Sequence, residues 1–286
     1  MANKSKEMIK GLLQSYDAIK DKSIVGSGKG VPRGIGISSP LSELYMADLD
    51  KEIKGRREVI FFSRYVDDIF IVLSDLAGQQ SIEAYYHQLE GQYKSRGLSL
   101  QAIGSDKCQL IGNLFKESSG VNPNTADLTY LGYHLYISRE KRKMQAIFGL
   151  SGRRKDKIKQ RIDHTFDRFG HVVKVDARQA KRDLRDGLNL ITGNIRLNNA
   201  KSSVKVGFYY NNDLLDREED FNELNQYLQS KTLPIPANLF GNTTDRENFE
   251  RKVKSYISSI SFKKRWEERK MYDISPERLK EIEKWL

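Results

Sequence analysis

The chain has 286 residues, 38% of them hydrophobic and 10% aromatic, which is enough to bury one large core or two smaller ones. Lysine and arginine number 49 against 38 acidic residues, a formal net charge of +11 that favours a polyanionic partner, nucleic acid before an anionic membrane surface. The single cysteine, Cys108, excludes an internal disulfide and a cysteine-based zinc cluster.

The sequence also bears on the location of the protein. The N-terminal segment lacks the apolar stretch of an export signal, and the longest apolar run, residues 69–73, is far shorter than the roughly 20 residues that a membrane span needs. We therefore expect a cytoplasmic protein with no membrane partner.

The first predicted elements are a loop and a helix. Residues 24–40 are rich in glycine, serine and proline, which indicates a loop. Ser38 or Ser39 can cap a helix and Pro40 suits its first turn. Apolar residues at positions 41, 44, 45, 49 and 53 then predict an amphipathic helix over about 40–53, on which Asp48 and Asp50 would serve in capping or packing.

A hairpin and a second helix follow. Two β-rich apolar runs over 59–73 are interrupted by Asp67 and Asp68, which predicts strand, turn, strand. Ser81 predicts the start of a helix and Gly97 its end, before a short strand over 98–103. A second hairpin is expected to pair residues 128–137 with residues 143–150.

The composition changes after residue 150. Residues 139–161 hold ten lysines and arginines against two acids, so most of the surplus positive charge lies in one segment. From about 153 the pattern is helical, with breaks expected at four glycines and a proline pair, and a last helix beginning at Ser275 and Pro276. We predict an α+β fold: an antiparallel sheet with helices on one face over 1–150, and a mostly helical domain over 151–286.

The pair Asp67–Asp68 is the sharpest chemical signal. Two carboxylates about 4 Å apart repel by roughly 4 kcal/mol at an effective dielectric of about 20, so something must offset their charge. Solvation of an exposed turn is one solution, and a divalent cation held by hard oxygen ligands is the other. The strongly apolar flanks favour the cation.

Four motifs in this order resemble the reverse transcriptases of bacterial retrons, group II introns and phage-defence or abortive-infection systems. Residues 30–41 resemble the glycine loop and SP helix under the template, and residues 65–68 resemble the metal-binding hairpin. Residues 97–100 with Lys107 resemble the next strand and its lysine, and residues 131–133 resemble the primer-grip hairpin. The resemblance covers about 28–160. It implies a partial polymerase palm over 1–150, followed by a helical thumb and C-terminal region.

The resemblance assigns roles to individual residues. Catalysis and metal binding fall to Asp67 and Asp68, and the primer grip falls to Leu131 and Gly132. Nucleotide and template binding fall to Arg33, Gly34, Ser39, Pro40, Tyr65 and Lys107. The basic segment, with Arg153, Arg154, Lys155 and Lys157, would lie on the nucleic-acid backbone. An ordinary loop, a plain hairpin and a solvated charge run are the alternatives, and the four histidines show no ligand spacing.

The sequence departs from the family pattern at its N-terminal side. The family has a further catalytic aspartate at the end of an upstream strand, preceded by nucleotide-binding fingers. Neither is found, since Asp17 and Asp21 follow no predicted strand and lie too close to Gly30. The chain therefore resembles the C-terminal part of a reverse transcriptase. It is a fragment, half of a split enzyme whose partner chain supplies the missing parts, or a non-catalytic subunit. Its unpaired sheet edge predicts poor solubility or association when it is made alone.

The resemblance implies an RNA-directed DNA polymerase that adds dNTPs to a 3′-hydroxyl by two-metal phosphoryl transfer. Mg²⁺ is the expected cofactor, with Mn²⁺ as an alternative. The expected partners are an RNA template and a DNA or RNA primer, in antiviral defence or a retroelement. The rival interpretations are a nucleic-acid-binding module without catalysis, and template-independent or protein-primed synthesis.

Overall fold

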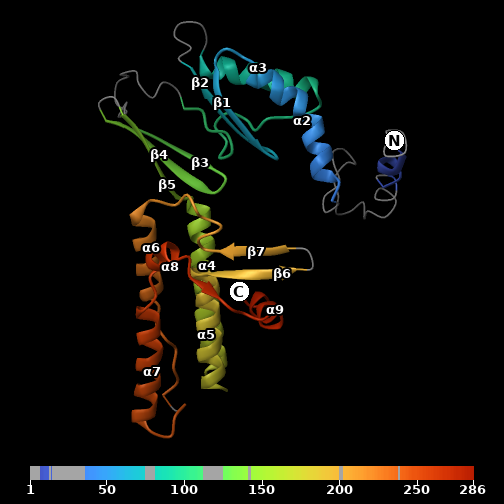
Figure 1. The fold of residues 1–286 in the computed structure, drawn as a ribbon. Coiled ribbons are helices and arrows are strands. Elements are labelled where there is room, and N and C mark those ends of the chain that lie inside the picture. The colour runs from blue at the N-terminus through green and yellow to red at the C-terminus, as the bar shows by residue number, and fades with distance from the viewer. Residues whose placement is uncertain are drawn as a thin grey trace. The chain divides into compact units, whose positions relative to one another are not determined.

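A computed structural model describes residues 7–12, 14, 36–74, 81–111, 125–140, 143–199, 202–237 and 239–286 (Figure 1). The chain forms two compact units, Met1–Asn113 and Leu114–Leu286, and we treat each one separately. Helices and small, mostly antiparallel sheets make up both, which confirms the α+β class. The boundary between these units differs from the domain boundary expected at residue 150, which stays a prediction, as does the likeness of the second part to a thumb.

In the first unit, helix α2 (Ser38–Lys54) confirms the helix predicted over 40–53. Its start differs from the expectation, because Ile37 occupies the capping position and no side chain caps the helix. Leu49 and Ile53 are fully buried as expected, together with Met46. Leu44 and Tyr45 were expected on the same face and are exposed instead, because the buried stripe is rotated toward Met46.

Helix α2 packs on a hairpin and on a second helix. The hairpin consists of β1 (Val59–Tyr65) and β2 (Asp68–Leu73), and helix α3 (Ile82–Ser95) begins at the predicted cap Ser81, whose hydroxyl accepts a hydrogen bond from the Ala84 amide. The predicted strand over 98–103 is wrong. No strand among the described residues pairs with it. Its leucines, Leu98 and Leu100, instead pack against the apolar cluster of this unit, which consists of Met46, Leu49, Ile53, Phe62, Tyr85, Leu89 and Tyr93.

One face of the β1–β2 hairpin joins this cluster through Phe62, whereas Ile60, Phe61 and Val72 are exposed. Helices therefore cover one face, as expected. The exposed apolar side chains fit the predicted tendency to associate, which stays a prediction.

The second unit begins with a three-stranded antiparallel sheet. Its strands are β3 (Thr125–Tyr130), β4 (Tyr133–Glu140) and β5 (Lys143–Leu150), in the order β3-β4-β5. The pairing of β4 with β5 confirms the predicted hairpin. The single strand expected over 128–137 is wrong, because Leu131 and Gly132 turn the chain and split it into β3 and β4.

Helices dominate the rest of the second unit, as predicted (Figure 1). They are α4 (Gly152–Val172), α5 (Ala177–Thr192), α6 (Glu218–Gln229), α7 (Thr243–Ser258), α8 (Phe262–Glu267) and α9 (Pro276–Glu283). Ser275 and Pro276 begin α9 as expected. Gly170 and Gly187 were expected to break helices and lie inside α4 and α5 instead. Both allow close packing, since a Cβ on Gly170 would lie 2.8 Å from Pro234.

This unit also contains a small sheet that was not predicted from the sequence. Strands β6 (Asn194–Asn199) and β7 (Ser202–Gly207) form an antiparallel hairpin, and β8 (Met271–Tyr272) pairs with β6 in parallel. The core of the unit is apolar and contains the fully buried Phe169, Leu188, Leu224 and Phe262. Among the residues that the structure describes, no helix has the length and apolar character to cross a membrane.

Candidate functional site

The predicted acidic pair lies at the turn between β1 and β2. Tyr65 pairs with Asp68 in the hairpin register, so Val66 and Asp67 form a two-residue loop and Asp68 is already the first residue of β2. All four residues are exposed. In the described part of the chain, no hydrogen bond or ion pair engages the Asp67 or Asp68 carboxylate. Because both side chains are exposed, a ligand from solution can reach them.

The backbone of this turn is strained at Val66. Its φ is +57°, in the left-handed region, whereas two-residue hairpin loops usually place glycine, asparagine or aspartate there. A β-branched side chain in this region is rare, and such a conformation costs about 1–3 kcal/mol. The surrounding structure must therefore stabilise the turn.

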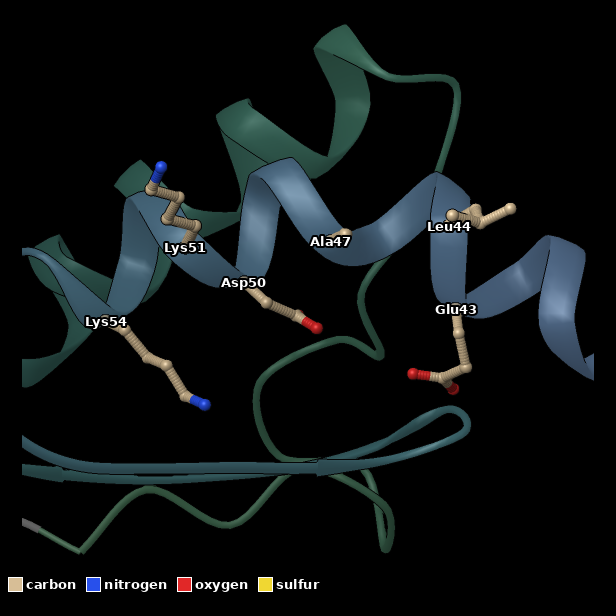
Figure 2. A pocket seen from close by; sticks show the side chains of 6 residues that line it. All are labelled: Glu43, Leu44, Ala47, Asp50, Lys51 and Lys54. Atoms are coloured by element: carbon tan, nitrogen blue, oxygen red, sulfur yellow. The ribbon is translucent and has the colours of Figure 1, made fainter.

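Arg64 supplies that stabilisation. Its Nη1 donates a hydrogen bond of 2.8 Å to the Val66 carbonyl oxygen. The rest of the guanidinium is held by helix α2, with Nη2 lying 2.8 Å from Asp50 Oδ2 and 2.7 Å from Glu43 Oε2. Figure 2 shows the Glu43 and Asp50 side chains pointing from α2 toward the hairpin. The Arg64 side chain is only 3% exposed, so the turn is tied to α2 by a buried cation.

Electrostatics keep this contact charged. The hydrogen bond from Arg64 lowers the pKa of Glu43, and the hydrogen bonds to Asp50 and Glu43 raise the pKa of Arg64 further above its already high value. Sequence reasoning missed Arg64. The signal available was the seven-residue spacing of Glu43 and Asp50, which places two acids on one helix face.

An open hollow of about 510 Å³ runs along the same face of α2 (Figure 2). Its lining residues come from α2, and they are Glu43, Leu44, Ala47, Asp50, Lys51 and Lys54. The two acids that hold Arg64 form part of its wall.

The other predicted nucleotide and template residues are only partly described. Ser39 and Pro40 lie in the first turn of α2, Tyr65 is 63% exposed at the end of β1, and Lys107 is exposed in a turn. No hydrogen bond or ion pair joins Lys107 to the acidic turn in the ranges that the structure describes. Arg33 and Gly34 lie outside the described residues.

The predicted primer-grip residues form the β3–β4 turn. Leu131 and Gly132 have φ values of +49° and +80°, as in a two-residue loop with both residues in the left-handed region. Arg154 Nη2 donates a 3.1 Å hydrogen bond to the Leu131 carbonyl, and its guanidinium lies over the Tyr133 ring. The positive φ of Gly132 favours glycine, and a Cβ there would approach Arg154 Nη2 to 2.5 Å, so a larger residue would displace this guanidinium.

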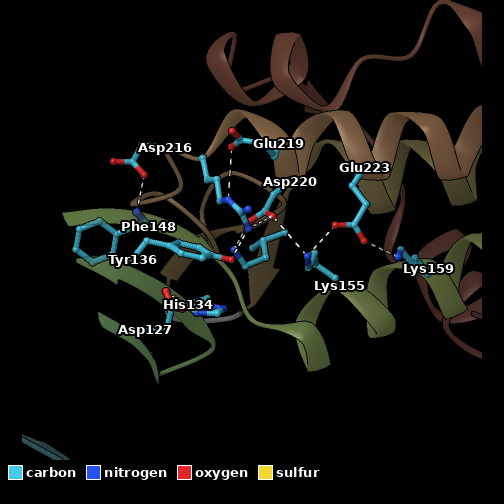
Figure 3. A network of polar contacts seen from close by, with 12 residues as sticks. Asp127, His134, Tyr136, Phe148, Lys155, Lys159, Asp216, Glu219, Asp220 and Glu223 are labelled. Carbon is cyan, nitrogen blue, oxygen red and sulfur yellow. Dashed lines mark hydrogen bonds and ion pairs between the residues drawn. The ribbon is translucent and has the colours of Figure 1, made fainter. Parts of the chain in front are cut away.

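Two of the four predicted backbone-binding cations have contacts inside the fold. Arg154 donates to Asn212 Oδ1 at 2.8 Å as well as to Leu131. Lys155 Nζ lies 2.7 Å from Glu223 Oε2 and 3.5 Å from Asp220, which is 1% exposed (Figure 3). The structure therefore gives Arg154 and Lys155 internal contacts. Their role as phosphate ligands stays a prediction.

Arg153 and Lys157 differ from these two residues. Both are exposed on α4, and neither contacts an acidic side chain in the portion of the chain that is described. They fit the predicted role better, because a cation with no internal partner can neutralise a phosphate without breaking a contact.

The pair of lysines around Glu223 makes a pH-dependent contribution to stability. Hydrogen bonds from Lys155 and Lys159 lower the pKa of Glu223. Because the folded-state pKa is depressed, this stability is present above the unfolded pKa of about 4.3 and is lost as the pH falls through the lower folded value. Glu223→Gln should lower the free energy of unfolding by about 0.5–1 kcal/mol at pH 7, and the loss should shrink as the pH falls through the lowered folded-state pKa of Glu223.

Thermal unfolding followed by tryptophan fluorescence at several pH values measures this difference. Glu247→Gln removes an exposed carboxylate from α7 and is the matched control, for which we expect almost no change. A loss for Glu223→Gln that does not shrink as the pH falls would contradict the assignment.

Comparison with known proteins finds a similarity over part of the chain. Residues 2–135 match the family model described as reverse transcriptase (RNA-dependent DNA polymerase). This segment is similar to a reverse transcriptase domain. It includes the acidic turn and the Leu131–Gly132 turn, and it begins earlier and ends earlier than the range of about 28–160 expected from the motifs. Searches of curated proteins and of solved structures found no match.

The match implies divalent metal ions, and the acidic turn partly fits them. Mg²⁺ is usually bound through one or two carboxylates, with waters and substrate phosphates completing its shell. Asp67 and Asp68 provide two exposed carboxylates of this kind. Within the described ranges, no group of three or more histidine, cysteine, aspartate or glutamate residues could hold a metal ion. Asp17 and Asp21, the upstream aspartates weighed for a third carboxylate, lie outside those ranges.

Proposed function

We propose that the chain is an RNA-directed DNA polymerase that adds dNTPs to a 3′-hydroxyl. The observation that carries the proposal is the pair of exposed carboxylates, Asp67 and Asp68, which have no partner among the described residues and lie on a hairpin turn held in place by Arg64. The match of this region to the reverse transcriptase family supports it.

The proposed reaction forms one bond and breaks one. The primer 3′-oxygen bonds to the α-phosphorus of the dNTP, the bond from that phosphorus to the bridging oxygen breaks, and pyrophosphate leaves as the hydroxyl proton passes to water. Mg²⁺ or Mn²⁺ bound at the turn would stabilise the negative charge on the phosphoryl oxygens. Asp67 and Asp68 would hold the metal ions, and the rate enhancement would come mainly from positioning and charge stabilisation.

The remaining predicted residues act on substrates in this proposal. Leu131 and Gly132 place backbone against the primer end, and Lys107 places a cation where charge develops on the leaving pyrophosphate. The residues proposed to contact the template and the nucleotide are Arg33, Gly34, Ser39, Pro40 and Tyr65. Arg153 and Lys157 would contact the nucleic-acid backbone, with Arg154 and Lys155 beside them.

Incorporation of labelled dNTPs by the purified chain tests the proposal. The assay compares primed RNA, primer alone and no nucleic acid, each with Mg²⁺, with Mn²⁺ and with a chelator. We expect incorporation that requires primed RNA and a divalent ion. Incorporation without template would favour template-independent or protein-primed synthesis. No incorporation under any condition would contradict an enzyme that is active as a single chain.

The second candidate function is nucleic-acid binding without catalysis, either as a separate module or as one subunit of a split enzyme. It is favoured by the two carboxylates found at the turn, because the family uses a third. A partner chain supplying the fingers and the missing aspartate would restore incorporation in the split-enzyme case. For either candidate we propose a cytoplasmic role in bacterial antiviral defence or in a retroelement.

A further inference from the structure

We propose that Arg64 is a positioning residue for metal binding at the Tyr65–Asp68 turn. Its guanidinium holds the Val66 carbonyl and thereby fixes the direction in which the Asp67 and Asp68 carboxylates point. The kinetic consequence rests on the proposed polymerase function, whereas the effect on metal binding does not depend on it.

The first support is the match between the donors of Arg64 and their acceptors. Nε donates to both carboxylate oxygens of Asp50, at 3.0 and 3.1 Å. Nη2 is shared between Asp50 and Glu43, and Nη1 is shared between Glu43 Oε1 at 3.1 Å and the Val66 carbonyl at 2.8 Å. Each guanidinium nitrogen thus has a partner, in the planar fork geometry that a lysine ammonium cannot reproduce.

The second support is that the hydrogen bond from Arg64 is accepted by Val66, the residue with the strained backbone. Val66 is one of three non-glycine residues with positive φ in the described ranges, and Asp67 follows it directly in the loop. A hydrogen bond to the Val66 carbonyl fixes the peptide unit that links Val66 to Asp67. Because a β-branched residue otherwise avoids this conformation, loss of that bond would let the turn relax and redirect both carboxylates.

The third support is the rigidity of the anchor. Glu43 and Asp50 lie two helical turns apart on α2, and Leu49 and Ile53 of the same helix are completely buried in the apolar cluster. Arg64 therefore connects the turn to a helix that is fixed by the core. Groups that bind metal ions keep their geometry best when the residues behind them are themselves held in place.

A purely structural role for Arg64 predicts different effects when the residue is replaced. If Arg64 only fastened strand β1 to helix α2, its loss would lower stability but leave the turn and its carboxylates unchanged. The contact with Val66 is what separates the two roles. The variants are therefore chosen to act on that contact.

The experiment compares wild-type protein with Arg64→Lys, Val66→Gly and the double variant. Tb³⁺ alone is the metal probe, read by its luminescence on excitation of the protein's aromatic side chains, and hydrogen exchange reads the amides of residues 66–68. Arg64→Lys should weaken Tb³⁺ affinity by about tenfold and speed exchange at the turn, which corresponds to losing one charge-assisted hydrogen bond. Val66→Gly in the double variant should restore affinity to within about threefold, because glycine adopts the positive φ without strain.

Two further variants make the result specific. Arg96→Lys alters a comparable arginine, whose Nη2 lies 2.8 Å from Glu52 of α2, and should leave Tb³⁺ affinity unchanged. Glu43→Gln removes the negative charge of one exposed carboxylate that holds Arg64. It should give a smaller loss of Tb³⁺ affinity than Arg64→Lys. An Asp67→Asn/Asp68→Asn double variant identifies the part of the luminescence that comes from the turn.

The proposal is overturned if Arg64→Lys lowers the melting temperature yet leaves Tb³⁺ affinity and turn exchange at wild-type values. It is also overturned if Val66→Gly restores neither affinity nor exchange. If wild-type protein incorporates no dNTP, the proposed function fails while the metal-binding result still decides the role of Arg64. If it does incorporate dNTP, Arg64→Lys should lower kcat about tenfold with KM for dNTP nearly unchanged.

Discussion

Asp67→Asn is expected to lower template-directed dNTP incorporation by at least about a thousandfold, which corresponds to about 4 kcal/mol of transition-state stabilisation. Asp67 is an exposed loop residue whose carboxylate has no partner in the described part of the chain, so its replacement removes no internal contact. An amide keeps the shape of the side chain and loses the negative charge that holds a divalent ion. The loss should therefore appear in chemistry and leave the fold intact.

The measurement is incorporation on a primed RNA, together with affinity for the same RNA. The affinity of Asp67→Asn should stay within about threefold of wild type, because backbone binding depends on cations elsewhere. Asp106→Asn removes another exposed aspartate of the first unit and is the matched control, for which we expect wild-type incorporation. Full activity of Asp67→Asn would remove the metal site from the proposed mechanism.

Asp183→Ala is expected to destabilise the second unit by about 3–5 kcal/mol. The Asp183 side chain on α5 is 0% exposed and accepts hydrogen bonds from Arg168 Nε at 3.0 Å and Arg278 Nη2 at 2.6 Å. Gln179 donates to the same carboxylate at 2.7 Å. Removing the carboxylate leaves two arginines on α4 and α9 without their shared acceptor, one of them only 15% exposed.

Tryptophan fluorescence measures this effect selectively, because Trp266 and Trp285 both belong to the second unit. The unfolding midpoint of Asp183→Ala should fall by about 10 °C. Asp163→Ala removes a carboxylate that is 38% exposed on α4, and it should cost no more than about 1 kcal/mol. Equal losses for the two variants would mean that burial of Asp183 does not set its contribution.

Local sequence signals were sufficient for several elements. Ser81 caps α3 and Ser275 with Pro276 begins α9, because a side-chain cap and a proline in the first turn act within three or four residues. The β1–β2 hairpin was predicted from its two apolar runs. Asp67 and Asp68 were placed in its turn because they lie between these runs. The resemblance to reverse transcriptases was predicted from motifs in the same part of the chain, and the match over residues 2–135 supports this resemblance.

The pairing of strands with partners elsewhere in the chain could not be predicted in the same way. The strand expected over 98–103 has the right composition but no partner strand, and the strand expected over 128–137 is divided by a turn at Leu131 and Gly132. Strand propensity describes how a segment suits a sheet, and only the availability of a neighbour decides whether a strand forms.

The sequence by itself determined the α+β class, helices α2, α3 and α9, the helical character of the second unit, the basic segment and the two aspartates on a hairpin turn, because these depend on local periodicity and composition. Only the tertiary structure decided that Arg64 holds this turn through Glu43 and Asp50, and that Arg154 and Lys155 have internal contacts. The partners of these cations lie 14 to 68 residues away along the chain. The spacing of Glu43 and Asp50 places two acids on one helix face, but the partner that they meet depends on which helix faces and strands the fold brings together.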